Sequence, residues 1–407
     1  MHRVAVTGMG GVTAFGCEWS QIEARLKDLR NAVRFMPEWD RYTDLNSKLA
    51  VPIASFEPPG HWPRKHTRGM GRVAQLAVAA AERALRQADL LGDPLLASGA
   101  AGIACGSSIG STPDLRDYAV MLLEGSSAGL NANSYVRMMP HTAAANVSMF
   151  FGLRGRMIPT SSACTSGSQA IGYAYECIKQ GAQKVMLAGG AEELCPTQAI
   201  SFDILYATSR RNAEPHATPR PFDCDRDGLV VGEGAGILVL EDLEHARARG
   251  AHVHAELVGF ATNCDGRHAT RPQEETMRRV QELALSDARL GPGAIGYVNA
   301  HGTGTEHGDI AESRATAAVF GPGVPVSTQK SYLGHTLGAC GALEAWFSIE
   351  MMNAGWFAPT LNLERIDPQC GQLDYIMAEG RRVQTEYVMS NNFAFGGVNT
   401  SLVFRRA

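Results

Sequence analysis

The 407-residue sequence lacks the cysteine spacings that build metal sites and disulfide frameworks. Its nine cysteines, an odd number scattered from Cys17 to Cys370, include no C-x-x-C pair and no histidine–cysteine cluster at zinc spacing. Scattered cysteines of this kind are typical of a protein from a reducing compartment. We therefore expect neither a metal site nor a disulfide framework.

Long apolar runs and a strong excess of either charge are also missing. No uninterrupted apolar stretch approaches the roughly 20 residues that span a bilayer, and Met1-His2-Arg3 passes into a strand-like run without a signal-peptide pattern. The net charge of −4 arises from interspersed residues of both signs, which gives no reason to expect nucleic-acid binding. These absences predict a cytoplasmic protein that binds neither a membrane nor nucleic acid.

What the sequence does contain is a large apolar fraction and regularly placed glycines. With 45% apolar residues, the chain can bury one or two substantial cores. Its 44 glycines lie at the ends of strand-like runs and the starts of helix-like runs, which is typical of an α/β protein. Buried strands are predicted at Val4–Thr7, Ile103–Cys105, Val185–Ala188, Gly236–Leu240, Ala255–Gly259, Tyr297–Asn299, Val324–Ser327 and Ser401–Phe404.

Two predicted helices share the same local arrangement. One covers Ser166–Gln180 and is followed by Gly181, and the other covers about Gly341–Asn353 and is followed by Gly355. Each comes after a strand and a cluster of small residues. Two explanations stay open at this point: a duplication of half of the chain, or the strand–turn–helix units that are common in α/β folds. In the first case, the charged segment 242–251 joins halves that pack as one unit.

Cys164 stands where a predicted strand ends and the helix Ser166–Gln180 begins. Its neighbours are serine, threonine, alanine and glycine, which let a substrate and the backbone come close. A helix N-terminus lowers the pKa of a thiol and offers free N–H groups to a developing oxyanion. Cys164 is therefore a candidate nucleophile, while a buried structural cysteine is the alternative for this position.

Two histidines and a lysine occupy similar positions later in the chain. His301 follows an apolar strand and opens a loop rich in glycine and threonine, a placement where α/β proteins keep functional groups. Lys330 and His335 lie between another strand and a glycine-lined helix start. The structural alternatives are a hydrogen-bonded loop histidine, a solvated lysine and a helix-capping histidine.

One cysteine and two histidines on separate strand-end loops fit covalent acyl catalysis. A thiolate accepts the acyl group, and imidazoles donate hydrogen bonds or move protons. A cysteine hydrolase requires one histidine, whereas a second imidazole indicates that negative charge must be stabilised at another atom, such as an enolate oxygen. The residue pattern alone predicts thiol-dependent acyl transfer and goes no further.

Eight sequence phrases, taken in order, carry a resemblance to a known family. They are Val4–Gly10, Ser161–Cys164, Ala188–Leu194, Arg220–Gly228, Gly232–Gly236, His301–Thr305, Lys330 with Gly334 and His335, and Ser390–Asn399. Together they resemble the elongating β-ketoacyl-acyl-carrier-protein synthases of the thiolase-like superfamily, the 3-oxoacyl-carrier-protein synthase I and II type. The resemblance spans nearly the whole chain. It implies a five-layered α-β-α-β-α fold of two duplicated halves, residues 1–245 and 246–407, and an obligate dimer.

The resemblance also implies a reaction and a role for each site residue. Cys164 would receive an acyl chain from carrier-protein phosphopantetheine, which arrives with its substrate, so that the enzyme needs no cofactor of its own. His301 and His335 would promote the decarboxylation of a malonyl group, and the resulting enolate would attack the acyl-cysteine to give a 3-oxoacyl chain. Neutral imidazoles suit this task, because they stabilise an enolate without protonating it.

Further residues would support this site. Lys330 and Glu312 would hold its polar groups in place, and the backbone N–H groups of Cys164 and Phe395 would form the oxyanion hole. Phe395 would also be the gating aromatic residue of the family. The residues expected to bind substrate are Thr303 and Thr305, which would hydrogen-bond the phosphopantetheine arm, and Phe393.

Two features depart from the family pattern. Carrier proteins are acidic, and Arg64, Lys65 and Arg68 fall where a basic docking patch is expected. A second basic cluster expected at residues 125–131 is replaced by a small, uncharged sequence. This points to another carrier protein, to a different way of docking it, or to a loop that varies without consequence. In addition, Ala394 replaces the usual glycine before the gating phenylalanine, a change that would stiffen the gate.

Several functions remain in competition. The first is fatty-acid chain elongation, and the second is a ketosynthase of a dedicated aryl polyene or type II polyketide pathway, acting as a homodimer or beside a chain-length-factor-like subunit. A non-catalytic partner subunit is the third, which the presence of Cys164 argues against because such subunits lose it. A thiolase acting on coenzyme A thioesters usually needs a second catalytic cysteine, and Cys340 and Cys370 both lie outside a suitable motif.

Overall fold

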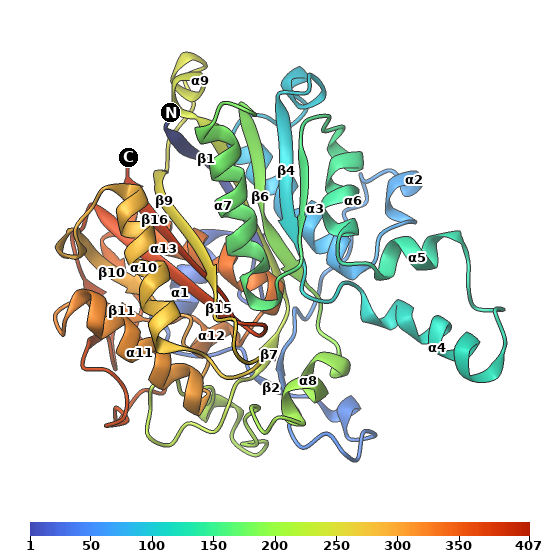
Figure 1. Cartoon of the computed structure of the whole chain (residues 1–407). Coiled ribbons are helices and arrows are strands. Elements are labelled where there is room, and N and C mark those ends of the chain that lie inside the picture. The colour runs from blue at the N-terminus through green and yellow to red at the C-terminus, as the bar shows by residue number, and fades with distance from the viewer.

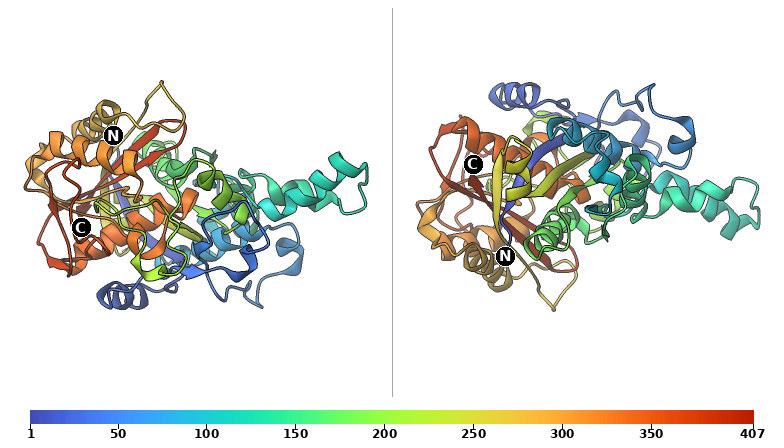
Figure 2. Two further views of the ribbon diagram at one scale, coloured as in Figure 1. Left: turned by 90° about the horizontal axis from the view of Figure 1, so that it is seen from below. Right: turned by 90° about the horizontal axis from the view of Figure 1, so that it is seen from above.

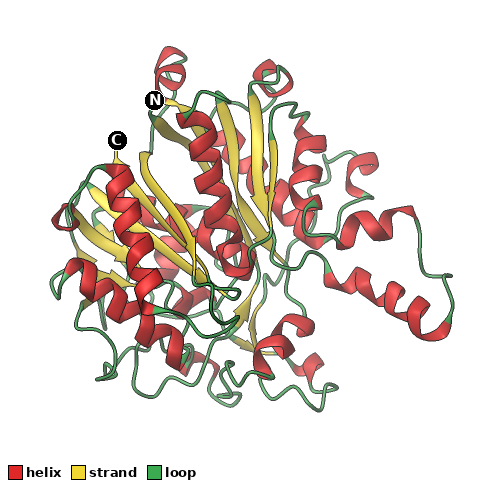
Figure 3. Cartoon of the chain, in the orientation of Figure 1, coloured by secondary structure: helices red, strands yellow, loops and turns green.

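The computed structural model describes all 407 residues of the chain. Eleven strands form one mixed sheet in the order β13-β11-β10-β15-β16-β9-β1-β8-β6-β4-β5 (Figures 1 and 3). Their bounds are Val4–Val12 for β1, Ala101–Gly106 for β4, Met157–Thr160 for β5, Val185–Glu192 for β6, Gly234–Asp242 for β8, Ala255–Cys264 for β9, Ile295–Asn299 for β10, Pro325–Ser327 for β11, Asp374–Tyr375 for β13, Tyr387–Ala394 for β15 and Val398–Arg406 for β16. Two small sheets hold β2 (Arg34–Phe35) with β3 (Leu49–Val51) and β7 (Val231–Gly232), and β12 (Trp356–Phe357) with β14 (Arg381–Arg382).

The two halves of the large sheet repeat one topology. In the first half, β1 is antiparallel to β8 and β8 to β6, whereas β6, β4 and β5 run parallel. In the second half, β9, β16, β15, β10 and β11 repeat these pairings in the same order. β1 pairs with β9 at Val4–Val6 and joins the halves into one sheet. This repetition resolves the choice left open by the sequence in favour of a duplication.

Helices cover both faces of the sheet in layers. α7 (Ser166–Lys179) and α13 (Cys340–Ala354) contact each other and strands of both halves, so they lie between the halves. α3 (Arg72–Gln87) and α6 (Thr142–Phe151) cover the first half from outside, and α10 (Glu274–Ala288) and α11 (Glu306–Phe320) cover the second. The expected five-layered α-β-α-β-α thiolase-like fold is therefore present.

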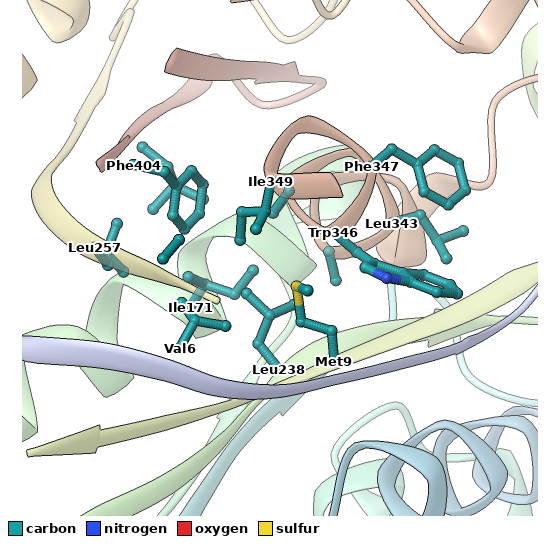
Figure 4. Close-up of a cluster of buried hydrophobic side chains, with 14 of the residues drawn as sticks. Val6, Met9, Ile171, Leu238, Leu257, Leu343, Trp346, Phe347, Ile349 and Phe404 are labelled. Carbon is teal, nitrogen blue, oxygen red and sulfur yellow. The ribbon is translucent and has the colours of Figure 1, made fainter. Parts of the chain in front are cut away.

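The central layer is held by apolar packing on all sides. α13 is buried along almost its whole length, as expected for a helix that is hydrophobic around its entire circumference. Leu343, Trp346 and Ile349 from this helix pack against Ile171 from α7 and Leu238 from β8 (Figure 4). A close approach of the two helix starts requires glycine, because a Cβ atom at residue 341 would lie 2.7 Å from the backbone nitrogen of Ser168.

The remaining helices lie outside these layers. They are α1 (Trp19–Lys27), α2 (Arg64–Thr67), α4 (Leu115–Glu124), α5 (Ala132–Met138), α8 (Pro196–Asp203), α9 (Leu243–Ala248) and α12 (Lys330–Leu333). α4 and α5 form an arm that extends away from the body of the molecule (Figure 2). The arm exposes large apolar side chains, with Leu122 at 79% and Leu123 at 84% exposure, a surface that is typical of an interaction site. None of the helices is both long and apolar enough to cross a membrane.

Candidate active site

Cys164 lies in a strained turn between β5 and α7. The turn Ala163–Thr165 is a short 3-10 helix that leads directly into α7. Ala163 adopts a left-handed conformation, with φ at 51°, although it is not glycine. The sulfur is therefore placed at the N-terminal end of a buried 14-residue helix, where the helix dipole favours negative charge.

His335 is in direct contact with this sulfur. Its Nε2 lies 2.9 Å from Cys164 Sγ. Its other ring nitrogen, Nδ1, accepts a hydrogen bond from the backbone N–H of Leu337 at 3.3 Å. Because an N–H group already points at Nδ1, the proton of the neutral ring belongs on Nε2. His335 therefore points an N–H donor at the sulfur.

His301 completes the cluster from the end of β10. Its ring centroid lies 5.2 Å from that of His335, and the two rings are nearly perpendicular, at 87°. One nitrogen of each ring and the sulfur of Cys164 all lie within 4.8 Å of one another. The structure thus brings together one thiol and two imidazoles from three loops that are distant in the sequence.

Burial sets the protonation state of all three groups. It raises the pKa of the Cys164 thiol to about 12, an effect that the Lys330 ammonium and the backbone N–H groups of Phe395 and Cys164 itself partly offset. Burial, followed by the positive charge of Lys330, lowers the pKa values of His301 and His335 well below 6.5. At neutral pH the resting site therefore holds a thiol and two uncharged imidazoles.

A buried ion pair supports His301 from behind. Lys330 Nζ donates to the Glu344 carboxylate on α13, and both side chains are almost fully buried. Burial is the largest single effect and lowers the pKa of Lys330, but the charge of Glu344, its hydrogen bond and the other nearby acidic groups together outweigh burial and hold the pKa above its usual value. Asn392 on β15 donates from Nδ2 to Glu344 at 2.6 Å and lies 3.4 Å from His301 Nδ1. The positive charge is thereby kept in place near His301 and His335.

Sequence reasoning singled out neither Glu344 nor Asn392. Asn392 stands in the phrase Ser390–Asn399 that carried the resemblance, but its position there gave no hint of its partner. Glu344 is one of two acids, with Glu350, in a helix whose other residues are mostly apolar, and an acid in such a helix is the signal that could have pointed to it.

Glu312 fixes the loop that carries His301. Its two carboxylate oxygens accept hydrogen bonds from the backbone N–H groups of His301 at 2.6 Å and Gly302 at 2.7 Å. Burial raises the pKa of Glu312 to about 8, and the two N–H groups oppose this rise. Glu312 thus acts on the backbone of the His301 loop, whereas Lys330 pairs with Glu344.

Aromatic side chains of β15 and of the turn that follows it lie beside the cluster. Phe395 lies on the turn between β15 and β16, is 37% exposed, and stands 5.1 Å from the ring of Phe202 on α8. Phe393 is buried, with its ring 6.2 Å from that of His301. Gly396 and Gly397 follow with φ at 86° and 72°, a conformation that side chains with a Cβ rarely adopt.

A cavity of about 540 Å³ leads from the surface to the cluster. It is lined by Cys164, His301, His335, Phe393, Phe395, Thr303, Thr305 and Glu312, among other residues. Thr303 Oγ1 and Thr305 Oγ1 lie 2.9 Å apart on its wall. Arg64, Lys65 and Arg68 do not line the cavity; they are exposed on and just after the short helix α2.

A metal ion is a poor fit for this cluster, although cysteine and histidine are common metal ligands. Binding through His335 Nε2 would require the proton on Nδ1, which would then face the N–H of Leu337. The charged Lys330 also lies close enough to depress both histidine pKa values. The arrangement suits N–H donors to a developing anion better than it suits a cation.

Comparisons with known proteins agree on one family. The model "Beta-ketoacyl synthase, N-terminal domain" matches residues 1–246, and "Beta-ketoacyl synthase, C-terminal domain" matches residues 254–364. A β-ketoacyl synthase of known crystal structure from Burkholderia phymatum is 61% identical, with a TM-score of 0.99 over 100% of both chains. The 3-oxoacyl-[acyl-carrier-protein] synthase 2 of Synechocystis sp. is 35% identical over 99% of this chain and 98% of its own. The solved ishigamide ketosynthase/chain length factor is 31% identical, with a TM-score of 0.91 over 100% of this chain and 99% of its own.

Proposed function

Because the chain belongs to the β-ketoacyl synthase family, we propose that it is an acyltransferase that joins an acyl chain to a malonyl unit carried by an acyl carrier protein, giving a 3-oxoacyl-carrier-protein. The observation that carries this proposal is the 2.9 Å contact between Cys164 Sγ and an N–H donor of His335, with a second neutral imidazole beside it. The reaction requires no cofactor of the enzyme's own, since the phosphopantetheine arm arrives on the carrier protein.

The first step is acyl transfer to Cys164. The sulfur attacks the carbonyl carbon of the acyl-carrier thioester, the bond to the pantetheine sulfur breaks, and the Cys164 proton leaves with that sulfur. The backbone N–H groups of Cys164 and Phe395 both favour negative charge beside the Cys164 sulfur. They therefore stabilise the oxyanion of the intermediate. Phe395 lies on the turn between β15 and β16, so this turn fixes the position of the second N–H donor.

The second step generates the carbon nucleophile. The malonyl carboxylate leaves as CO₂, and its electron pair forms an enolate on the thioester. His301 and His335 donate N–H hydrogen bonds to the enolate oxygen, and their low pKa values prevent them from protonating it. Lys330 and Glu344 hold His301 through Asn392, and Glu312 holds its backbone.

Condensation completes the cycle. The enolate carbon attacks the acyl carbonyl, a carbon–carbon bond forms, and the bond to Cys164 sulfur breaks. The sulfur regains one proton from solvent, which balances the loss of CO₂. Thr303 and Thr305 bind the phosphopantetheine arm along the cavity wall in both half-reactions.

Mass measurement of the intact protein tests this function directly. After incubation with acyl-carrier proteins, we expect a mass increase of one acyl group that is absent in Cys164→Ala. With malonyl-carrier protein, His301→Ala should release CO₂ far more slowly than the wild type. Release at the wild-type rate would show that His301 has another role, and no adduct with any acyl donor would favour a non-catalytic partner subunit.

A second candidate function is chain extension in a dedicated polyene or polyketide pathway. The likeness to the ishigamide ketosynthase/chain length factor favours it, as does the uncharged segment 125–131, which is exposed between α4 and α5. A panel of acyl-carrier proteins with saturated and polyunsaturated chains of several lengths separates the two functions. Efficient acylation by saturated chains supports fatty-acid elongation, and a preference for conjugated chains supports the second candidate.

We further infer how the chain meets its protein partners. Carrier protein docks at Arg64, Lys65 and Arg68, all of which are exposed around α2, and long-range attraction to the acidic carrier makes this step sensitive to salt. A second copy, or a related subunit, pairs with β5, which is one of the two edges of the large sheet. Reversing the charge at Lys65 should raise the KM for carrier-bound substrate and leave alkylation of Cys164 by iodoacetamide unchanged.

A further inference from the structure

A second buried thiol, that of Cys340, lies directly behind the nucleophile. Its Sγ donates a hydrogen bond to the carbonyl oxygen of Cys164 at 3.2 Å. Asn392 Nδ2 lies 3.8 Å from the same sulfur. A ring nitrogen of His301 and a carboxylate oxygen of Glu344 lie within 4.8 Å of it. Cys340 is only 2% exposed and does not line the cavity. It therefore touches the catalytic turn but has no path to a substrate.

The thiol of Cys340 remains protonated. Burial raises its pKa well above the usual 9.0, and the nearby Lys330 offsets this only in part. Because Cys340, unlike Cys164, does not line the cavity, its thiol cannot reach a substrate as a nucleophile or a base. Its available property is the S–H donor, which is directed at Cys164. Cys340 is therefore not the second catalytic cysteine that a thiolase would need.

The duplication explains how Cys340 comes to occupy this position. The turn Leu337–Ala339 leads into α13 as the turn Ala163–Thr165 leads into α7, and Leu337, like Ala163, has a positive φ, here 48°. Cys340 is therefore the counterpart of Ser166, since each is the first residue of a central helix.

These two counterparts make different contacts. Ser166 Oγ donates to the carbonyl of Ala163 at 2.7 Å and accepts from the N–H of Ser162 at 3.0 Å, so it secures its own turn. Cys340 instead reaches across to the turn of the other half. The turn that holds the nucleophile is thus secured twice, once from each half.

We propose that Cys340 is a positioning residue, whose hydrogen bond to the Cys164 carbonyl holds the strained nucleophile turn in its reactive geometry. Left-handed residues other than glycine persist only where surrounding contacts hold them. This turn carries both the sulfur of Cys164 and the backbone N–H group of Cys164, which is directed at that sulfur. Loss of the S–H donor therefore loosens both groups that act on the acyl carbonyl.

The proposal rests on the proposed function and predicts a selective defect. Acylation and condensation use the sulfur and N–H group of Cys164, whereas malonyl decarboxylation depends on the two histidines. Cys340→Ala should therefore slow acylation of Cys164 about three- to tenfold, the range expected for loss of one hydrogen bond. Its rate of malonyl decarboxylation should stay within about twofold of the wild type.

Two further variants sharpen the test. Cys340→Ser keeps a donor at a position where the duplicated helix already carries serine, and it should restore acylation to within about twofold. Cys105→Ala is the matched control, because Cys105 is a fully buried thiol on the outer face of β4, in a different core. The control should leave acylation unchanged while removing the same atoms. All four proteins are compared by intact-mass acylation rates, iodoacetamide alkylation of Cys164, CO₂ release and Tm.

Two results would overturn the proposal. One is a folded Cys340→Ala whose Cys164 is acylated and alkylated at the wild-type rates. The other is a loss of decarboxylation as large as the loss of acylation, which would indicate general damage to the site. If Cys340→Ala does not fold, a tenfold loss of acylation in folded Cys340→Ser overturns it instead. A wild-type protein that is alkylated at Cys164 but never acylated refutes the proposed function, while the alkylation rates still decide the role of Cys340.

Discussion

At the scale of single residues, the candidate site depends on which charged side chains are buried and on which side chains they are paired with. Lys330 is a buried positive charge in the network behind the cluster, and it is paired with Glu344. Its charge lowers the pKa values of both histidines and partly opposes the rise at Cys164. One buried ammonium therefore favours the thiolate during reaction and keeps the imidazoles neutral.

Removing Lys330 should cost stability as well as activity. In Lys330→Met, the Glu344 carboxylate stays buried without its partner, and breaking such a pair typically costs about 3–5 kcal/mol. We expect a loss of that size in the free energy of unfolding, measured by urea titration. The double variant Lys330→Met/Glu344→Gln should regain part of it. A single variant as stable as the wild type would contradict the pairing.

Glu312 should give the protein a measurable pH dependence. Its pKa is about 8 in the folded protein and near 4.5 when exposed, so the folded state binds more protons between these values. The stability that Glu312 contributes is therefore fully present below pH 4.5 and is lost as the pH rises through 8. The histidines act in the opposite sense, since their lowered pKa values cost stability only below about pH 6.5.

The window from pH 6.5 to 8 consequently isolates Glu312 from the histidines. In Glu312→Gln, the decline of unfolding free energy with pH should be shallower than in the wild type by at most about 1.4 kcal/mol per pH unit. Urea unfolding at several pH values measures the difference between the two slopes. Identical slopes would mean that Glu312 is already ionised in the folded protein.

Individual residues differed in how far the sequence could reveal them. Cys164, His301 and His335 follow strands and precede glycine-rich or helical segments, so local pattern alone marked them as candidates. The partner of Lys330 could not be found in this way, because Glu344 meets it only once α13 folds against α12. Cys340 was considered and set aside, since no motif surrounds it and its contact with Cys164 is purely spatial.

At the scale of elements, strands and central helices were readable because their apolar runs are continuous. The predicted helix 341–353 is observed at Cys340–Ala354, and Gly355 ends it with φ at 63°. The turns before the central helices were not readable. A positive φ is signalled by glycine or asparagine, and here alanine and leucine adopt it at positions 163 and 337 because the packed halves hold them there.

The contact between the two central helices gives a prediction at this scale. In Gly341→Ala, the new Cβ atom would lie 2.7 Å from Ser168 N and from Asn392 Oδ1, which forces α7 and α13 apart. Overpacking of this kind costs about 1–3 kcal/mol, and it should also displace Cys340 and slow acylation. Gly293→Ala is the control, because no atom lies within 4 Å of its added Cβ. Equal Tm values for the two variants would contradict the close approach.

At the scale of the whole molecule, the sheet has an unprotected side. β5 forms an outer edge of the sheet, with Met157 46% exposed. The arm of α4 and α5 extends away from the body of the molecule (Figures 1 and 2). It carries further exposed apolar side chains, Leu122 and Leu123 among them. An exposed edge strand can add a strand from another chain. The same features suit both a second copy of this chain and a related subunit, so the sequence alone did not distinguish a homodimer from a heterodimer.

A charge on this edge should separate the protomers. Met157→Lys places an ammonium where the partner strand would pair, and we expect the apparent mass in size-exclusion chromatography with light scattering to fall from dimer to monomer. Leu91→Lys, at a similarly exposed leucine following α3, should leave the mass unchanged. A wild type that is already monomeric, yet dimerises when a related chain is added, would identify a heterodimer.

The two corresponding turns before α7 and α13 differ in the reactive groups that they carry, and this difference has a consequence for variants of the chain. The first turn carries the sulfur, and the second follows His335 and carries no reactive atom of its own. A gene copy that lost the sulfur would still cleave carbon dioxide from its donor, and one that lost the rings would still store an acyl group. Either variant would keep one of the two half-reactions, because the sulfur and the rings lie on separate loops.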